Sequence, residues 1–364
     1  MKTLMTADAA GGVWTYALTL AEALAPHGVE IVLATMGRLP DVRQRRAVAA
    51  HENVTLATST YKLEWMDSPW TDVQAAGEWL LELEATVQPD VVHLNGYAHA
   101  ALAWSRPTLL VAHSCVLSWW RAVLGAEAPP SWNRYRTALR EGVSAAQLVI
   151  APSRTILADL ERECGPIAHA RVIPNGSDAQ RFWVAPKQSF VLSAGRLWDD
   201  AKNVAALDRA APHVPWPIYI VGDRRHPDGT TRVYTHAHVL DAMAPEELGA
   251  WMACAAIYAS PARYEPFGLS VLEAAFSGCA LVLGNIASLR EHWDGAAVFV
   301  PSDDEEALAT VLSDLADDPV RRAKLGHAAF SRARNHFGLR RQGRAYLTAY
   351  QDVMRAPAEV PVCA

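Results

Sequence analysis

Short apolar runs alternate with amphipathic stretches along most of the chain. In the first half, "MKTLMTA" precedes apolar positions at helical spacing over Val13–His27, and "VEIVLATM" then predicts a buried strand. Further strand candidates are "DVVHLNGY", "TLLVAHS" and "LVIAPS", with helical patterns between them. Alternation of this kind predicts parallel strands joined by crossover helices.

The pattern thins over residues 175–189, where turn formers and polar residues gather, and then begins again with "FVLSAGR", "WPIYIVGD", "AIYASPA" and "ALVLGN". We therefore predict an α/β fold of two doubly wound, Rossmann-like halves, which leave a cleft at the carboxyl ends of their strands. The expected domains are an N-terminal, acceptor-side domain (1–177), a linker (178–187) and a C-terminal, donor-side domain (188–338). A final helix with its tail (339–364) is expected to pack back on the first domain.

Composition places the chain among ordinary globular proteins. It has 364 residues, about half of them apolar, and a formal net charge of −6. This acidic balance disfavours a nucleic-acid partner, because phosphate backbones require a basic face. Local basic runs at Arg43–Arg46 and Arg321–Arg344 favour solvated helix faces, with contact to a membrane surface left open.

The five cysteines are scattered, with no Cys-x-x-Cys spacing, and predict neither a disulfide framework nor a cysteine zinc site. The start of the chain lacks the pattern of a signal peptide, and no run reaches the roughly 18 apolar residues of a membrane span. We therefore expect a protein of the cytoplasm.

The segment "GRLWDDAKN" follows the predicted strand "FVLSA" directly. Arg196 would lie at the carboxyl end of that strand, and Lys202 near the start of the next helix. A guanidinium with its planar fork of donors and a compact ammonium together suit a diphosphate. Two surface cations flanking a loop are the plain alternative.

The segment "YEPFGLSVLEAAFSG" predicts a turn followed by a helix that ends at Gly278. Backbone N–H groups from Phe267 to Ser270 would lie at the helix start, which attracts anions. The carboxylates of Glu265 and Glu273 would flank that anion site and accept hydrogen bonds from hydroxyls. Ordinary dipole complementation or an exposed loop acid would explain either one singly. The set as a whole predicts a ligand with a central diphosphate and hydroxyl-rich rings at both ends, a nucleotide sugar.

"EPFGLSVLE" resembles the signature of the retaining glycosyltransferases of group 1, family four of the sequence-based classification. The likeness extends over "GGVWTYALTLAEAL", "VVHLN", "VAHS", "VIPNGSDAQRF" and "IVGD", and so over nearly the whole chain. It implies the GT-B fold, two Rossmann-like domains facing across a cleft. It also implies the transfer of a hexose from a nucleoside-diphosphate sugar to an acceptor hydroxyl. No Asp-x-Asp motif lies near the expected cleft, so we expect side chains and a helix dipole, and not a metal, to neutralise the diphosphate.

The resemblance also implies roles for individual residues. Glu273 would receive the ribose hydroxyls of the donor, and Glu265 would meet hydroxyls of the transferred sugar. The remaining implied contacts are those of Arg196 and Lys202 with the diphosphate, of the Phe267, Gly268 and Leu269 amides with the donor, of Gly11 and Gly12 with the phosphates, and of His113 beside the sugar at the reaction centre.

No cofactor is expected, because the nucleotide sugar is a substrate. A UDP-sugar is the favoured donor, with GDP- and ADP-sugars left open. The acceptor is a sugar, a lipid-linked sugar or a small molecule with a hydroxyl. His226, His236 and His238 lack supporting carboxylates or thiolates, so no metal site is predicted. Trp119 and Trp120 would stack on an acceptor ring or belong to the core, and both readings stay open.

Two rival functions remain at this point. One is a nucleotide-sugar epimerase on the same scaffold, which would need no acceptor. The other is a non-catalytic nucleotide-sugar-binding protein, which would bind the donor and release no diphosphate.

Overall fold

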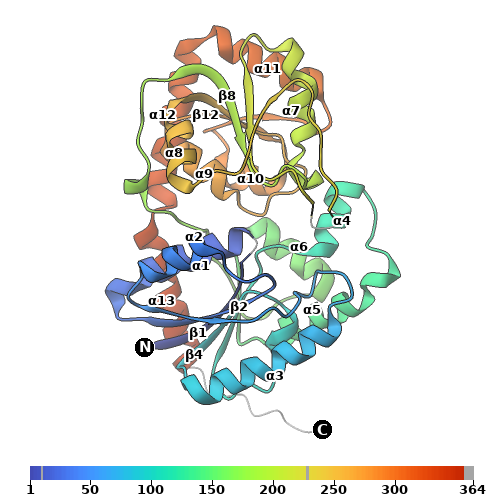
Figure 1. Cartoon of the computed structure of the whole chain (residues 1–364), viewed down its shortest axis with the longest axis vertical. Helices are drawn as coiled ribbons and strands as arrows, with labels where there is room; N and C mark the ends of the chain where they lie inside the picture. Colours follow the sequence, from blue (N-terminus) through green and yellow to red (C-terminus); the bar gives the residue numbers. More distant parts are fainter. Residues whose placement is uncertain (10, 227–228, 356–364) are drawn as a thin grey trace. The chain divides into compact units, whose positions relative to one another are not determined.

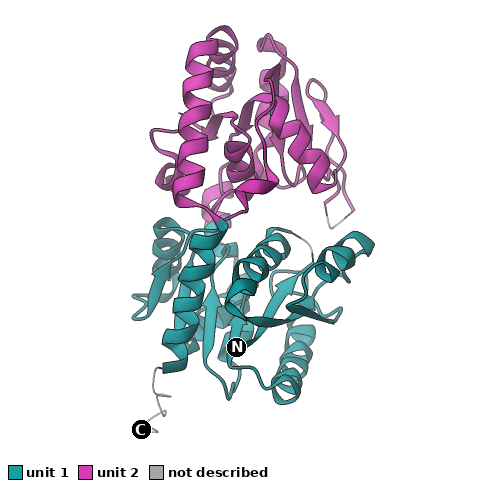
Figure 2. Ribbon diagram, turned by 90° about the vertical axis from the view of Figure 1, so that its left-hand side faces the viewer, with its two compact units in different colours: residues 1–118, 127–176, 339–364 teal, residues 119–126, 177–338 magenta. Residues whose placement is uncertain are grey.

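The computed structural model describes residues 1–9, 11–226 and 229–355 (Figure 1). Contacts divide the chain into two compact units, coloured separately in Figure 2. Unit 1 comprises Met1–Ser118, Glu127–Gly176 and Leu339–Ala364, and unit 2 comprises Trp119–Ala126 and Ser177–Gly338. The short segment Trp119–Ala126 therefore belongs with unit 2, which the apolar pattern did not indicate.

Unit 1 is built on a seven-stranded parallel sheet with helices on both faces. Met5 on the interior strand Lys2–Asp8 joins the apolar cluster of the helix Gly12–Leu24, and its neighbour Leu4 packs on the opposite face, as the alternation of side chains along a strand requires. In sheet order the strands are β3 (Val54–Thr58), β2 (Glu30–Met36), β1 (Lys2–Asp8), β4 (Val91–Leu94), β5 (Thr108–Val111), β6 (Leu148–Ala151) and β7 (Ala170–Val172). The helices are α1 (Gly12–Leu24), α2 (Val42–Ala49), α3 (Trp70–Val87), α5 (Asn133–Ala145), α6 (Arg154–Cys164) and α13 (Leu339–Arg355), while α4 (Val116–Leu124) continues into unit 2.

Unit 2 repeats this plan with a six-stranded parallel sheet. Leu192 and Val191 on one central strand face two separate apolar clusters, so this sheet too is covered on both faces. In sheet order the strands are β10 (His238–Leu240), β9 (Ile218–Val221), β8 (Gln188–Ala194), β11 (Ala255–Ser260), β12 (Ala280–Gly284) and β13 (Val298–Val300). The helices are α7 (Val204–Ala210), α8 (Pro245–Cys254), α9 (Leu269–Phe276), α10 (Ala287–Trp293), α11 (Glu305–Asp317) and α12 (Pro319–His336).

Single turns of 3-10 helix complete the described elements. They are η1 (Ala25–His27), η2 (Ala98–Ala101), η3 (Pro130–Trp132), η4 (Ala179–Arg181), η5 (Asp200–Lys202) and η6 (Ala211–His213). Of these, η5 lies in the segment singled out by the sequence and precedes α7.

Two differences from the sequence pattern have plain physical reasons. The strands β3 and β7, which the apolar runs did not predict, lie at the two edges of the unit 1 sheet and are short, without fully buried residues. The predicted strand "DVVHLNGY" ends at Leu94, because the Asn95 amide donates to the Thr6 hydroxyl and the chain leaves the ladder there.

The last helix, α13, packs against α1 within unit 1. Its side chains Tyr346 and Tyr350 are fully buried and join the same apolar cluster as Leu20 and Leu24 of α1. Gly343 allows the two backbones to approach, because a Cβ there would lie 2.6 Å from the carbonyl oxygen of Ala23. No helix in the described part of the chain is long and apolar enough to cross a membrane.

We expect Gly343→Ala to lower the free energy of unfolding by about 1–3 kcal/mol, because the new methyl group would force α1 and α13 apart. The usual effect of this change inside a helix has the opposite sign, a gain of about 1 kcal/mol. Gly249→Ala in α8 is the matched control, since a Cβ there would lie 3.8 Å from the Trp183 ring, an ordinary contact. Urea denaturation of both variants checks the expectation, and equal stabilisation by both would contradict it.

Candidate functional site

The site begins at the point where unit 2 reverses its strand order. Strands β8 and β11 are neighbours, and the chain proceeds outward from β8 to β9 and β10, and from β11 to β12 and β13. Loops that follow two such strands separate from each other and leave a crevice at the carboxyl edge of the sheet. Arg196 and Lys202 lie in the loop after β8, and Glu265 lies in the loop after β11.

The two loops are joined by main-chain hydrogen bonds. The carbonyl oxygen of Ala201 accepts from the amides of Arg263 at 2.9 Å and Tyr264 at 3.3 Å. The side-chain amide of Asn203 donates to the carbonyl oxygens of Pro261 at 3.0 Å and Ser302 at 2.6 Å. Asn203 has a left-handed backbone with φ 52°, which asparagine tolerates better than most residues. These bonds fix Lys202 opposite Glu265.

A glycine after β9 allows the first of these loops its close course. Gly222 has φ 145°, and a Cβ at this position would lie 1.8 Å from the carbonyl oxygen of Gly195, the residue before Arg196. The amide of Gly195 donates to the carbonyl oxygen of Val221 at 3.0 Å. The glycine of "IVGD" therefore serves the backbone path that leads to Arg196.

Each of the two side chains predicted to bind the diphosphate is paired with a carboxylate. Lys202 Nζ lies 2.5 Å from Glu265 Oε2, and the Glu265 side chain is only 10% exposed. Arg196 Nη2 lies 2.8 Å from Asp199 Oδ2, and its guanidinium lies 5.4 Å from the centre of the Trp198 ring. The Arg196 side chain is 48% exposed. The structure thus brings Lys202 and Glu265 together and turns Arg196 toward Asp199.

The turn into α9 bends at Gly268, the residue expected to let a ligand approach the backbone closely. Gly268 is the N-cap of α9 with φ 87° and ψ 69°, a backbone that strongly favours glycine. The hydrogen bond from the Leu272 amide to the Gly268 carbonyl oxygen begins the helix, so the amides of Phe267, Gly268 and Leu269 precede that bond. The side chain of Phe267 is buried in the core, with its ring centre 4.9 Å from that of His292.

Glu273 lies on the second turn of α9 in a partly buried position. Burial raises the pKa of this carboxyl group from 4.5 to about 7. The same burial raises the pKa of the Tyr258 phenol, and the neighbouring carboxylates of Glu273 and Glu265 add to that effect. The Tyr258 hydroxyl donates to the carbonyl oxygen of Ala194 at 3.1 Å and so supports the end of β8 beneath the site.

In unit 1, His113 belongs to a buried polar network. The side-chain amide of Asn95 donates to the carbonyl oxygen of Thr6 at 2.6 Å, which leaves its oxygen as an acceptor. That oxygen lies 2.7 Å from Nε2 of His113 and 3.2 Å from Nε2 of His93. The hydroxyl of Tyr350 on α13 lies 2.7 Å from Nδ1 of His93.

This arrangement assigns the tautomers of both rings. Nε2 of each histidine donates to Asn95, Nδ1 of His93 accepts from Tyr350, and Nδ1 of His113 keeps its lone pair. Burial lowers the pKa of His113 to about 3 and that of His93 likewise to about 3, with the neighbouring His113 adding to the effect at His93. Both rings are therefore neutral near pH 7.

The other two predicted residues of unit 1 follow β1. Gly11 is the N-cap of α1, and Gly12 is the first residue of that helix. Gly11, Gly12 and His113 thus belong to unit 1, while Arg196, Lys202, Glu265, Phe267, Gly268, Leu269 and Glu273 belong to unit 2. Within unit 2, the two loops and the start of α9 gather the predicted residues at one switch point.

Sequence reasoning missed three residues that the structure places in support of the site. Asp199 is the partner of Arg196, and an acid three positions after an arginine was the available signal. Asn203 joins the two loops, and Asn95 orients His113. The contacts of Asn203 and Asn95 connect segments far apart in the sequence, so no local pattern predicted them.

Among the residues that the structure describes, no group of three or more His, Cys, Asp or Glu side chains could hold a metal ion. None of the described cysteines, at positions 115, 164, 254 and 279, forms a disulfide, and Cys363 lies outside the described residues.

Two family models match the chain. A model described as "Glycosyltransferase Family 4" matches residues 10–181, and one described as "Glycosyl transferases group 1" matches residues 188–318. Together they cover most of the chain. A D-inositol 3-phosphate glycosyltransferase of Xylanimonas cellulosilytica is 27% identical over 395 residues, which covers 96% of this chain and 94% of that protein. A glycogen synthase of Mycobacterium tuberculosis is 28% identical over 69% of this chain and 66% of its own length.

Solved structures share the fold. A sucrose-phosphate synthase of Thermosynechococcus elongatus superposes with a TM-score of 0.81 at 17% identity, covering 98% of this chain and 100% of that one. An Anabaena protein solved with UDP-glucose gives a TM-score of 0.75 at 18% identity, covering 97% and 100%. At these identities the likeness concerns the fold alone.

The raised pKa of Glu273 makes stability depend on pH. Folding favours the protonated carboxyl group, so this contribution is complete below pH 4.5 and is lost as the pH rises toward about 7. We expect Glu273→Gln, which does not titrate, to gain about 1–3 kcal/mol in free energy of unfolding relative to the wild type between about pH 5 and pH 8. Urea denaturation across this range measures it.

Glu247→Gln, at an exposed position of α8, is the control and should leave the pH dependence of the wild type unchanged. Parallel stability curves for the wild type and Glu273→Gln would show that Glu273 titrates as an ordinary carboxyl group.

Proposed function

The chain belongs to the glycosyltransferases of group 1 and family 4, and from this premise we propose that it is a retaining, metal-independent hexosyltransferase. The likeness to solved structures confirms the predicted α/β fold of the GT-B type. The proposal concerns the finer points: the donor, the stereochemistry and the residues that perform the transfer.

The observation that carries the proposal is the joined pair of Lys202 and Glu265 at the switch point, next to the start of α9. An ammonium and the amides of a helix start both favour an anion, and a carboxylate nearby accepts from hydroxyls. A nucleotide sugar supplies its diphosphate to the first set and its sugar hydroxyls to the second. Glu273, one turn further along α9, then lies on the side of the ribose.

The reaction breaks the bond between the anomeric carbon and a phosphate oxygen, and it forms a bond from that carbon to the acceptor oxygen. The acceptor proton passes to the departing diphosphate. Retention follows when departure and attack occur on the same face of the sugar. Arg196 and Lys202 stabilise the charge that develops on the leaving group, and donors held in place before the reaction do this most effectively.

The favoured donor is a UDP-sugar, with GDP- and ADP-sugars as alternatives and no separate cofactor. The Anabaena protein with the same fold was solved with UDP and with UDP-glucose. The acceptor is a hydroxyl-bearing molecule, and the relatives named above indicate two kinds to test: an inositol phosphate and a glucan.

The direct test incubates the protein with UDP-, GDP- and ADP-glucose and with D-inositol 3-phosphate or maltooligosaccharide. Release of the nucleoside diphosphate and the NMR coupling of the new anomeric proton report turnover and configuration. We expect an α-linked product from an α-linked donor, at the same rate with EDTA present. An inverted product or loss of turnover with EDTA would overturn the corresponding part of the proposal.

The same assay separates the rival functions. Conversion of the donor sugar to its epimer without an acceptor would identify an epimerase. Donor binding without diphosphate release under any acceptor would identify a binding protein.

Arg196→Ala should lower kcat by about a hundred- to a thousand-fold, the usual cost of removing one charge-stabilising donor. Arg209→Ala is the matched control, because Arg209 is half-exposed in the same unit and pairs with Glu305. Circular dichroism confirms that both variants fold. Activity of Arg196→Ala within about threefold of the wild type would remove Arg196 from the site.

Asp199→Asn should tighten the binding of UDP by about two- to fivefold, because the pair with Asp199 no longer competes for Arg196. Asparagine can still accept from the Ala201 amide, as Asp199 does at 3.0 Å, so the loop keeps its cap. Asp304→Asn, which changes the equivalent cap of α11, is the control. Isothermal titration calorimetry measures both, and weaker binding by Asp199→Asn would contradict the competition.

A further inference from the structure

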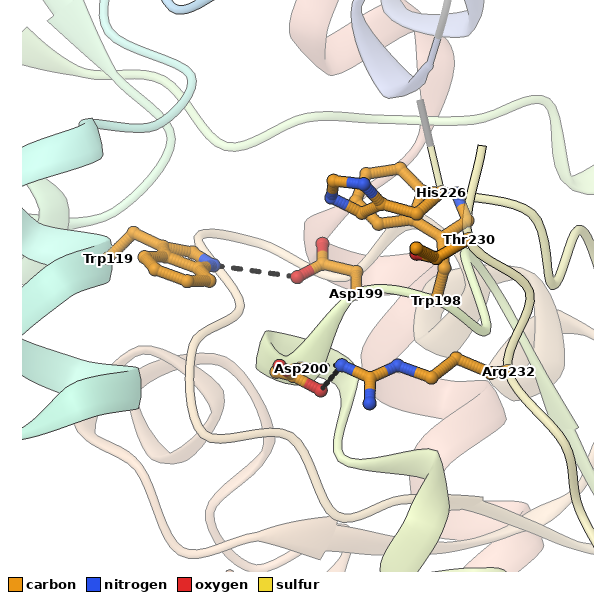
Figure 3. A pocket seen from close by; sticks show the side chains of 7 residues that line it. All are labelled: Trp119, Trp198, Asp199, Asp200, His226, Thr230 and Arg232. Atoms are coloured by element: carbon orange, nitrogen blue, oxygen red, sulfur yellow. Dashed lines mark hydrogen bonds and ion pairs between the residues drawn. The ribbon is translucent and has the colours of Figure 1, made fainter. Parts of the chain in front are cut away.

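Unit 2 contains a cavity of about 160 Å³ beside Arg196 (Figure 3). Three segments build it: Trp119 from α4, Trp198 to Asp200 from the loop after β8, and His226, Thr230 and Arg232 from the chain between β9 and β10. In Figure 3, Trp119 lies opposite Trp198, His226 and Thr230, and the Asp199 carboxylate points toward Trp119. None of the roles implied for the donor uses these side chains.

The charges in the cavity are already balanced. Asp200 binds the Arg232 guanidinium through both carboxylate oxygens, at 2.8 and 2.9 Å. Asp199 pairs with Arg196 and accepts from the indole N–H of Trp119 at 3.4 Å. A phosphate entering here would meet two carboxylates and an arginine already paired, so a charged anion is disfavoured. Donors and acceptors side by side suit a neutral ligand with several hydroxyl groups.

The aromatic walls limit the shape of that ligand. The ring of His226 lies edge-on to Trp198 with centres 4.8 Å apart, and Arg196 lies over the Trp198 ring. Trp119 has only an edge contact with Trp120, at 6.2 Å between centres, among the ring contacts recorded in the described residues. A cavity of about 150 Å³ in another protein accepts a single six-membered ring, so this one has room for a ring of that size.

We infer that this cavity binds one pyranose ring of the acceptor, with an apolar face of the sugar on Trp119 and its hydroxyls on Asp199, Asp200 and Arg232. The inference rests on the proposed function in one respect, the assignment of the ring to the acceptor. With departure and attack on the same face, the acceptor lies on the side of the leaving diphosphate. Asp199 connects the cavity to Arg196, the residue proposed to hold that group.

The test begins with binding alone. The probes are the methyl α- and β-pyranosides of glucose, galactose and mannose, observed by saturation-transfer difference NMR with the full chain. At least one probe should bind the wild type, and Trp119→Ala and Arg232→Ala should each weaken it at least fivefold. Trp183→Ala and Arg209→Ala are matched controls, because Trp183 is an exposed tryptophan of the same unit and Arg209 an exposed arginine.

Further measurements exclude other occupants and a folding defect. Uridine should fail to displace the bound pyranoside, and displacement would assign the cavity to a nucleobase and overturn the inference. UDP affinity within threefold of the wild type in Trp119→Ala shows that the variant is folded. Trp119→Phe, which keeps an aromatic face, should retain more binding than Trp119→Ala.

The outcomes separate this inference from the proposed function. If the protein turns over a nucleotide sugar but binds no pyranoside, or binds one equally well in Trp119→Ala, the cavity is not a sugar site. If pyranosides bind as expected and no nucleotide sugar is bound or turned over, the sugar site stands and the proposed function fails. If both hold, the acceptor KM in Arg232→Ala should rise at least fivefold with kcat changed less.

Discussion

The hydrogen bonds at Ala201 are the constraint on which the site depends. Two loops that leave a parallel sheet in opposite directions are not held together by the sheet itself. Without other contacts, the free energy of ligand binding would have to offset the conformational entropy lost when the loops become ordered. Here one carbonyl oxygen accepts from two amides of the opposite loop, and Asn203 closes the same junction through its side chain. Lys202 and Glu265 are therefore positioned by the fold and not by the ligand.

The carboxylates around this junction serve two physical purposes. Cations held near a helix start without partners would repel each other and the helix dipole. Asp199 and Glu265 neutralise Arg196 and Lys202. In the proposed function, both carboxylates would remain as acceptors when a diphosphate takes their place. On that proposal, binding would exchange the carboxylate partners of the two cations for the diphosphate, and the affinity for anions that bring no hydroxyl groups would be limited.

The parts of this arrangement that depend on neighbouring residues could be predicted from the sequence. Apolar runs bounded by turns predicted the central strands, and Gly268 with the acids on either side of it predicted an anion site at a helix start, because each signal lies within a few residues. The partner of Arg196, the junction at Asn203 and the network around His113 depend on contacts between distant segments. The placement of Trp119 in unit 2 is a tertiary fact of the same kind. A local sequence pattern predicts the buried face and the ends of a helix or strand, and it does not predict which elements pack against each other.

One more consequence follows from Tyr350. The hydroxyl that contacts His93, which shares Asn95 with the ring of His113, comes from α13, which is synthesised after all of unit 2. In the sequence, nearly all of unit 2 comes after the other segments of unit 1 and before that helix. On the ribosome, where domains generally fold as units from the N-terminal end, unit 2 can complete its core while unit 1 still lacks α13 and Nδ1 of His93 still lacks the Tyr350 hydroxyl. The part of unit 1 that precedes unit 2 in the sequence thus completes its fold only after unit 2 has been synthesised, and a polypeptide that stops before α13 carries a complete unit 2 and an incomplete unit 1.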